Sequence, residues 1–200
     1  RNMTVGGSKG SLSGNYAMDN SDLLLAVGTR FVCQSDCSRT GYPRVKRVIN
    51  INADLDDALH YRHTLALVGD VRRTLQKLNQ GIGPGSADKT EWLKTCAGKK
   101  QAWQAIKAER ECNPILVDDY WSGPVLTQPA AIRIATDWAK KRETVCFFDA
   151  GDVQANGFQI VEDDNTGDTF TESGASYMGF AASALLASAL ADQPRYGIAF

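Results

Sequence analysis

Short apolar runs alternate with stretches of helical periodicity along the 200 residues of the chain. Residues 22–28 (DLLLAVG) are apolar after the first position, which predicts a strand that is buried on both faces, as in a parallel sheet. Clusters of β-branched or aromatic residues predict further strands at 45–53, 65–68, 144–148 and 196–200. Because helical stretches separate the strands, we expect an α/β fold with an open parallel sheet flanked by helices.

Apolar periodicity and capping residues predict the connecting helices. Asp70 is a typical N-cap residue at the start of one of them. Thr127 supplies a capping hydroxyl for another, and Pro129 follows it in the first turn, where proline is favoured. The predicted helices span residues 54–61, 70–79, 86–111, 129–141 and 176–191.

Two stretches divide the chain into parts. Residues 80–86 (QGIGPGS) are a glycine- and proline-rich break, and residues 113–128 show no regular pattern. We therefore expect a first α/β unit at 1–79, a helical connection at 80–126 and a second α/β unit at 127–200.

Composition excludes some classes of partner. The 22 basic and 23 acidic residues give a net charge of −1, which argues against nucleic acid as the main partner. No apolar run approaches the roughly 20 residues that span a bilayer, so we expect no membrane partner. The five cysteines are scattered and odd in number, and no signal-peptide core follows Arg1. Both features favour reduced thiols in a cytoplasmic protein.

One spacing superficially resembles a zinc site. Cys33 and Cys37 lie upstream of His60 and His63, as in a site with two cysteines and two histidines. The intervening sequence has the pattern of a strand in an open sheet and not of a zinc finger. We therefore predict no metal site here, and we expect both histidines to be surface residues.

The carboxyl ends of the predicted strands carry candidate ligand-binding residues, because open parallel sheets bind ligands at that edge. Gly28 and Arg30 follow the first strand, Asn52 ends the second, and Asp70 follows the third. A glycine lets a phosphate approach the backbone, an arginine pairs with phosphate, and small polar side chains hold ribose hydroxyls. These residues predict a nucleotide site. The alternative is that Arg30 forms a surface ion pair and that Asp70 is simply a helix cap.

Several segments, taken in order, resemble the thiamine diphosphate-dependent enzymes. Three match the central domain of that family, and two match the start of its diphosphate-binding domain. The resemblance covers nearly the whole chain apart from about residues 80–126. The glycine-rich opening VGGSKGSLSGN is most similar to the acetolactate synthase-like branch that includes trihydroxycyclohexanedione hydrolases. The matching segments are SDLLLAVGTRF, VKRVININAD, LALVGDVRRTLQKL, FFDAGDVQ and ESGASYMGFAASALLASALA.

The resemblance implies a Rossmann-like central domain followed by the first part of a second α/β domain. It implies thiamine diphosphate and Mg²⁺ as cofactors, and a small carbonyl compound or 2-oxo acid as substrate. The reaction would be carbon–carbon cleavage or formation by a lyase, carboligase or dione hydrolase, through a thiazolium carbanion and enamine. A homodimer or homotetramer is implied, because active sites of the family form between subunits.

The resemblance also implies roles for individual residues. Met178 would be the catalytic wedge that bends the cofactor, whereas the alternative is a core methionine at a helix start. Gly174 and Ser176 would shape the backbone around the pyrimidine. The turn after the fourth strand is either an acidic loop or the diphosphate-binding turn, to which Gly151, Asp152 and Gln154 would belong. No residue is assigned as a metal ligand.

The sequence departs from the family pattern in four respects. The Gly-Asp-Gly…Asn metal motif, expected just after Phe200, and the N-terminal catalytic glutamate are absent, and the central domain starts partway through. We therefore expect a piece of a longer enzyme that is inactive alone and does not bind thiamine diphosphate with Mg²⁺. Asn50 and Asn52 stand where some relatives have aspartates that contact FAD or ADP. An amide hydrogen-bonds without bringing a charge, so the sequence leaves FAD or ADP binding open.

Two further interpretations compete with an enzyme fragment. The first is a free-standing nucleotide-binding module without catalysis, which would bind ADP, NAD or a related nucleotide. The second is a structural or interaction domain, which would bind neither nucleotide nor cofactor and would form a stable oligomer.

Overall fold

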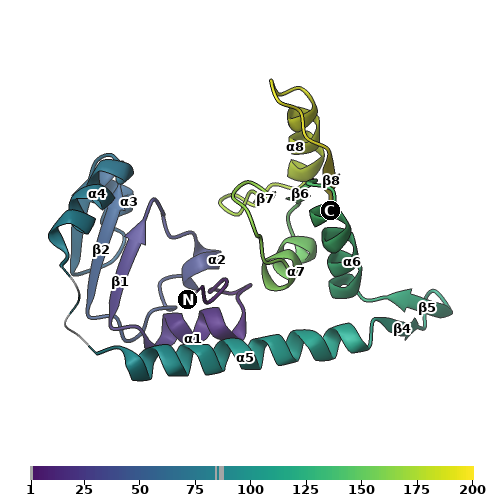
Figure 1. The fold of residues 1–200 in the computed structure, drawn as a ribbon, viewed down its shortest axis with the longest axis horizontal. Coiled ribbons are helices and arrows are strands. Elements are labelled where there is room, and N and C mark those ends of the chain that lie inside the picture. The colour runs from purple at the N-terminus through teal and green to yellow at the C-terminus, as the bar shows by residue number, and fades with distance from the viewer. Residues whose placement is uncertain (1, 84, 86–87) are drawn as a thin grey trace. The chain divides into compact units, whose positions relative to one another are not determined.

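The chain folds into two compact units, each built on its own parallel sheet. The computed structural model describes residues 2–83, 85 and 88–200 (Figure 1). The first unit contains residues 1–8 and 12–100, and the second unit contains residues 9–11 and 101–200. The expected α/β class is confirmed, because parallel strands alternate with helices in both units.

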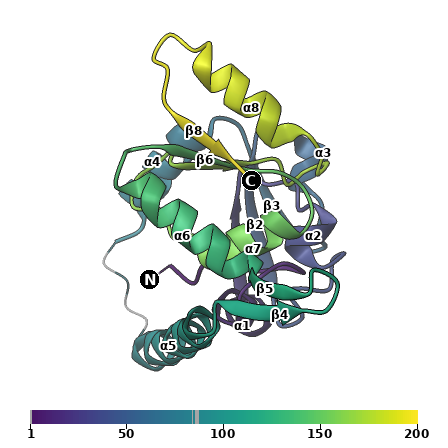
Figure 2. The same ribbon diagram turned by 90° about the vertical axis from the view of Figure 1, so that its right-hand side faces the viewer.

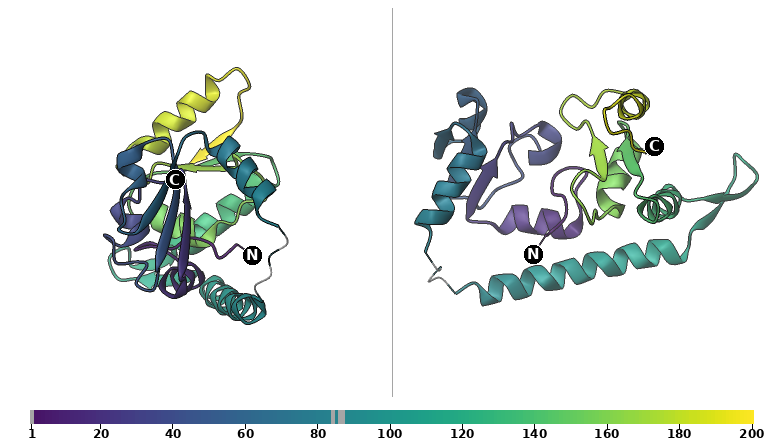
Figure 3. Two further views of the ribbon diagram at one scale, coloured as in Figure 1. Left: turned by 90° about the vertical axis from the view of Figure 1, so that its left-hand side faces the viewer. Right: turned by 45° about the horizontal axis from the view of Figure 1, so that its top comes forward.

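The first unit contains a three-stranded parallel sheet. Its strands lie in the order β1 (Leu23–Val27), β2 (Arg47–Asn52) and β3 (Thr64–Val68), and they are seen side by side in the left-hand view of Figure 3. In the register, Ile49 of β2 pairs with Leu25 of β1 and with Leu65 of β3. All three strands run in the same direction, so their carboxyl ends share one edge.

That edge carries the residues predicted to lie there. The N–H of Gly28 donates to the carbonyl of Ile51 at 2.8 Å, and the N–H of Gly69 donates to the carbonyl of Asn52 at 2.9 Å. These hydrogen bonds continue the two ladders by one residue. Gly28 and Asn52, which the sequence placed at the carboxyl ends of two strands, therefore share one rim, and Gly69 lies on the same rim.

Short helices connect the strands of the first unit. Asp54 caps α3, and its Oδ1 accepts from the N–H of Asp56 at 2.8 Å. Asp70 caps α4, and its Oδ1 accepts from the N–H of Arg73 at 2.8 Å, as predicted. The helices of this unit are α1 (Leu12–Asn20), α2 (Cys33–Asp36), α3 (Leu55–Ala58), α4 (Val71–Gly81) and the first part of α5 (Thr90–Cys112).

The prediction that the first strand is buried on both faces is wrong. Leu23, Leu25 and Val27 are 53%, 49% and 40% exposed, whereas Ala26 is 4% exposed. Ala26 pairs with Asn50, and the Asn50 side chain contacts the end of α3, so that face of the sheet is covered. The described elements of the first unit leave the other face of this edge strand open.

The second unit contains another three-stranded parallel sheet, in the order β7, β6, β8. The central strand β6 (Val145–Phe148) is buried at every position. It is flanked by β7 (Thr169–Thr171), which was not predicted, and by β8 (Gly197–Ala199). Cys146 pairs with Thr169 on one side and with Ile198 on the other.

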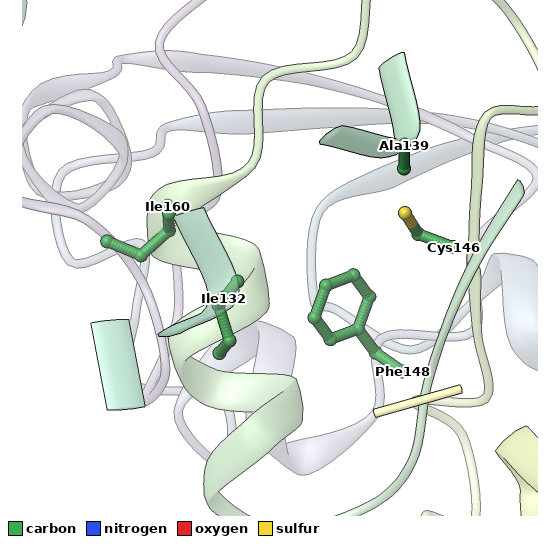
Figure 4. Packing of buried hydrophobic residues seen from close by; sticks show 5 residues of the cluster. All are labelled: Ile132, Ala139, Cys146, Phe148 and Ile160. Atoms are coloured by element: carbon green, nitrogen blue, oxygen red, sulfur yellow. The ribbon is translucent and has the colours of Figure 1, made fainter. Parts of the chain in front are cut away.

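Helices cover both faces of β6. Ile132 and Ala139 of α6 (Gln128–Lys140) and Ile160 of α7 (Asp152–Ile160) pack against one face (Figure 4). On the other face, Val145 and Phe147 pack against Ala181 of α8 (Phe180–Ala189). Figure 2 shows α6 and α7 on the opposite side of the sheet from α8. This arrangement gives three layers, and it explains why an uninterrupted apolar run forms the central strand.

The stretch predicted to be irregular is a β-hairpin. Strands β4 (Ile115–Asp118) and β5 (Gly123–Leu126) pair in antiparallel register, with Val117 opposite Pro124. Gly123 and Pro124 suggested a loop, but proline is tolerated on an edge strand, where its missing N–H leaves no ladder bond unmade. Figure 1 shows the hairpin between α5 and α6.

Helix α5 continues without a break from the first unit into the second (Figure 3, right). Its 23 residues include many that are charged. Within the part of the chain that the structure describes, neither this helix nor any other combines the length and apolarity needed to cross a membrane.

Candidate functional site

Two loops meet at the carboxyl edge of the second sheet. One loop follows β6 and begins at Asp149, and the other follows β7 and begins at Glu172. They lie at the same edge because the two strands are parallel neighbours, with Phe148 opposite Thr171. The residues that the sequence suggested for the cofactor all lie in these loops or in the first turn of α7.

Asp149 joins the first loop to the start of α8. Its carboxylate accepts from the N–H of Ala150 at 2.8 Å, of Gly179 at 2.9 Å and of Ala181 at 3.0 Å. These bonds favour the ionised form, and the one from Ala150 contributes most, so the pKa of Asp149 lies below its ordinary value. Asp149 is therefore an anionic cap of α8, a role that its position in the sequence does not reveal.

Glu172 holds the second loop. Its carboxylate accepts from the N–H of Gly174 at 2.6 Å, of Ala175 at 2.9 Å, of Ser176 at 2.6 Å and of Tyr177 at 3.4 Å. The backbone bonds, that of Ala175 first, hold the pKa of Glu172 below its ordinary value. One side chain thus collects consecutive backbone donors, which makes the loop a rigid support.

Met178 lies at the outer surface of this loop. Its side chain is 89% exposed, and that of its neighbour Tyr177 is 70% exposed. The alternative of a core methionine is therefore wrong. Ser176 (φ +58°) and Gly179 (φ +92°) adopt left-handed backbone angles, so the predicted helix at 176–191 begins only after them, at Phe180.

Gln154 is fully buried beneath the same loop. Its Nε2 donates to Thr171 Oγ1 at 2.8 Å and to the carbonyl of Glu172 at 2.9 Å, and the side chain is 0% exposed. Its Oε1 accepts from Lys9 Nζ at 3.1 Å. Gln154 therefore links α7 to the loop after β7, and both polar atoms of its amide are hydrogen-bonded to other protein groups.

The start of α7 has the features of an anion site. Gly151 (φ +86°) is the N-cap residue and has no side chain with which to cap the first turn. The first-turn N–H groups of a helix and the helix dipole favour an anion there. Lys9 Nζ lies 3.4 Å from the carbonyl of Gly151 and adds a positive charge, whereas Asp152 in the first turn adds a negative one. Sequence reasoning missed Lys9 because nothing local relates it to this turn.

The first sheet's carboxyl edge is less open than its residue types suggest. Asn52 Nδ2 donates to the carbonyl of Thr29 at 2.9 Å, and its Oδ1 accepts from the N–H of Asp54 at 3.2 Å. Asp70 caps α4, and Arg30 is exposed. A Cβ at Gly28 would meet no described atom within 4 Å, so crowding does not explain the glycine at this position. Its φ of +61° does, because glycine adopts this left-handed angle without strain.

Asn50 is part of the core and not of the rim. It is 0% exposed, and its Nδ2 donates to the carbonyls of Asp57 and Ala58, each at 3.2 Å. An aspartate could not make these two bonds, because an ionised carboxylate has no donor. The departure from the acidic family pattern at position 50 thus has a structural cause.

The prediction that His60 is a surface residue is wrong. His60 Nε2 and Tyr61 OH each lie 2.9 Å from Oδ2 of Asp36, whose side chain is 1% exposed. The imidazole stacks on Phe31, with ring centroids 5.3 Å apart. Burial and the bond to Asp36 raise the pKa of Tyr61 far above its ordinary value. This cluster joins the loop after β1 to the loop before β3.

The described residues give no support for a zinc site. His60 is engaged with Asp36, and among the residues that the structure describes, no group of three or more candidate ligands could hold a metal ion. The side chain of Cys33 lies outside the described part of the chain.

The amino edge of the second sheet holds a cavity of about 620 Å³. Two ion pairs line it: Lys140 with Asp164 at 3.1 Å, and Arg195 with Asp168 at 3.3 Å. Burial raises the pKa of Cys146, which lines this cavity, to about 11. The pairing of these charges argues for a structural role.

Comparison with known proteins agrees with the resemblance seen in the sequence. Residues 1–78 match the family described as thiamine pyrophosphate enzyme, central domain. A curated relative, 3D-(3,5/4)-trihydroxycyclohexane-1,2-dione hydrolase of Listeria monocytogenes serotype 4b (strain F2365), is 26% identical over 151 residues. That alignment covers 72% of this chain and 23% of the relative, so the chain spans about a quarter of the relative's length. The predicted resemblance to thiamine diphosphate-dependent enzymes is confirmed.

Proposed function

We propose that the chain is part of an enzyme that uses thiamine diphosphate, because residues 1–78 match the central-domain family of thiamine pyrophosphate enzymes. The proposed reaction is the cleavage or formation of a carbon–carbon bond, by a lyase, a carboligase or a dione hydrolase. When bound, this cofactor supplies an electron sink for the carbanion that such a reaction produces. Every other contribution comes from the protein.

The observation that carries the proposal is the exposed Met178, on a loop that two carboxylates hold in place. Glu172 holds the backbone just before Met178, and Asp149 holds the backbone just after it. A large apolar side chain that is 89% exposed on a fixed loop is available to pack under an apolar ligand. The described residues therefore fit the thiamine half of the cofactor.

The other site residues are assigned around Met178. The backbone at Gly174 and Ser176 would face the pyrimidine. The turn at Gly151 and Asp152 would lie at the diphosphate, where Lys9 supports the assignment by adding positive charge. Gln154 would act indirectly, because its amide is buried and bonded to Thr171. We expect Mg²⁺ to accompany the diphosphate.

We propose a small carbonyl compound or 2-oxo acid as the substrate. The name of the Listeria relative, a hydrolase of a cyclic dione, favours the dione hydrolase among the three reaction types. A homodimer or homotetramer and a cytoplasmic location complete the proposal. The open face of β1 (Leu23–Val27) supports association, and the free cysteines among the described residues support a reducing compartment.

A second candidate function is a nucleotide-binding module. The shared rim of Gly28, Asn52 and Gly69 supports it, since this is where parallel sheets bind nucleotides. ADP, NAD or a related nucleotide such as FAD would be the ligand. The internal hydrogen bonds of Asn52 weigh against it, because both polar atoms of that amide are already in use.

The test is a calorimetric titration of the protein expressed from its complete gene. We expect saturable, Mg²⁺-dependent binding of thiamine diphosphate, and exchange of the bound cofactor's C2 proton. Binding of ADP, NAD or FAD, without binding of thiamine diphosphate, would favour the nucleotide-binding module. No binding of either class would refute both functions and leave a structural or interaction domain.

A further inference from the structure

The loop before Met178 is held by one side chain. The Glu172 carboxylate accepts from the backbone N–H groups of Gly174, Ala175, Ser176 and Tyr177 at distances between 2.6 and 3.4 Å. Charge-assisted hydrogen bonds of this kind are roughly twice as strong as neutral ones. This carboxylate therefore fixes the path of the loop.

The loop lacks regular structure that could replace this carboxylate. Ser176 has a φ of +58°, which a residue with a side chain adopts at a cost of about 1 kcal/mol or more. The segment precedes α8, so its N–H groups have no helical partners. Without the carboxylate, we expect the loop to leave this conformation.

The backbone of Glu172 is itself held by a residue of α7. The carbonyl of Glu172 accepts from Nε2 of the buried Gln154 at 2.9 Å, and the same Nε2 donates to Thr171 Oγ1 at 2.8 Å. Gln154 of α7 thus anchors the backbone of Glu172, while the Glu172 side chain bonds the N–H groups of the loop. The Asp149 carboxylate accepts hydrogen bonds from the N–H groups of Gly179 and Ala181, which follow Met178.

We propose that Glu172 is a positioning residue of the cofactor site. Its carboxylate presents Met178 and the backbone of residues 174–177 to the pyrimidine side of thiamine diphosphate, without touching the cofactor's reacting atoms. This inference rests on the proposed function and adds a specific residue to it. It also explains why Met178 stays exposed on an ordered loop instead of folding into the core.

The test compares Glu172→Gln with the unaltered protein, both expressed from the complete gene. The amide has the same size but one acceptor oxygen, so several of the N–H groups lose their partner. We expect the amides of residues 174–177 to exchange with solvent about tenfold faster without cofactor, because each bond to a charged acceptor is lost. Cofactor affinity or the rate of C2 proton exchange should fall by a similar factor, while amides of β6 (Val145–Phe148) keep their exchange rates.

Asp118→Asn is the matched control. Asp118 also accepts from a backbone N–H in a turn of the second unit, that of Trp121 at 2.9 Å. This variant should change neither the exchange of residues 174–177 nor cofactor binding. Glu172→Asp keeps both acceptor oxygens on a shorter side chain, and it should recover part of the slow exchange and part of the binding. It also serves if Glu172→Gln does not fold.

Each outcome decides something. Unchanged loop exchange in both Glu172 variants overturns the inference, as does a loosened loop with unchanged cofactor affinity and C2 exchange. If the unaltered protein binds no thiamine diphosphate, the proposed function and the positioning role both fall. The exchange measurement would still decide whether Glu172 holds the loop, so the two failures can be told apart.

Discussion

Replacing Asn50 by aspartate should strongly destabilise the first unit, although it brings the sequence closer to the acidic pattern of the family. Asn50 is 0% exposed, and its Nδ2 donates to the carbonyls of Asp57 and Ala58. The substitution removes both bonds and places a carboxylate against two carbonyl oxygens. Each carbonyl left without a donor costs about 1–3 kcal/mol, and burial of the charge adds to this. We expect a loss of about 3–5 kcal/mol at pH 7.

The loss should depend on pH in a defined direction. Burial and the two carbonyls raise the pKa of the introduced carboxyl in the folded state. The variant is therefore closest to the original protein below the ordinary carboxyl pKa of about 4, where the group is protonated and can donate once. Its stability relative to the original protein falls as the pH rises through the raised pKa.

The assay is urea unfolding followed by the amide resonances of β2 (Arg47–Asn52), which report on the first unit alone. Asn52→Asp is the matched control on the same strand. Asn52 donates to one carbonyl, that of Thr29, and is 8% exposed, so its loss should be about 1–2 kcal/mol. A loss at position 50 that is no larger than the loss at position 52, or that does not vary with pH, would refute the reasoning.

Three further predictions follow from the second unit. Met178→Ala should leave the melting temperature of the cofactor-free protein unchanged, because the side chain is 89% exposed, yet slow C2 proton exchange of bound cofactor; a lowered melt with normal exchange would contradict the wedge role. Gly157→Ala should cost about 1–3 kcal/mol in urea unfolding, because its Cβ would lie 2.7 Å from the ring of Phe148, and an unchanged midpoint would show that the ring moves freely. Cys146 should react with a thiol reagent at pH 8 far more slowly than the exposed Cys112, since its pKa is about 11 and burial blocks access; equal rates would contradict this.

The central strand of the second unit and the starts of α4 and α6 were predictable because local signals determine them. The apolar run of β6 (Val145–Phe148) is buried on both faces, as such runs are in parallel sheets. Thr127 accepts from the N–H of Ala130 at the start of α6, as its position before a proline indicated. In both cases the residues within one element carry the information.

Burial and pairing depend on what lies outside an element, and there the predictions failed. The run at β1 (Leu23–Val27) is as apolar as that of β6, yet it lies at an edge with one face open. The hairpin at residues 115–126 was missed because Gly123 and Pro124 are typical both of loops and of edge strands. His60 was expected at the surface because its partner Asp36 lies 24 positions away in the sequence.

The charge at the candidate cofactor edge also differs from what the residue types suggest. From the sequence, Asp149 and Asp152 together would repel a diphosphate. In the structure, the ionised Asp149 faces the N–H groups at the start of α8, where the helix dipole offsets its charge. Lys9 lies 145 positions from Gln154 in the sequence, yet it places a cation beside the turn at Gly151, where α7 begins. Its positive charge there is opposite in sign to that of Asp152. With one cation and one carboxylate at this turn, its side chains carry no net positive charge, so a diphosphate bound there would still need a divalent cation.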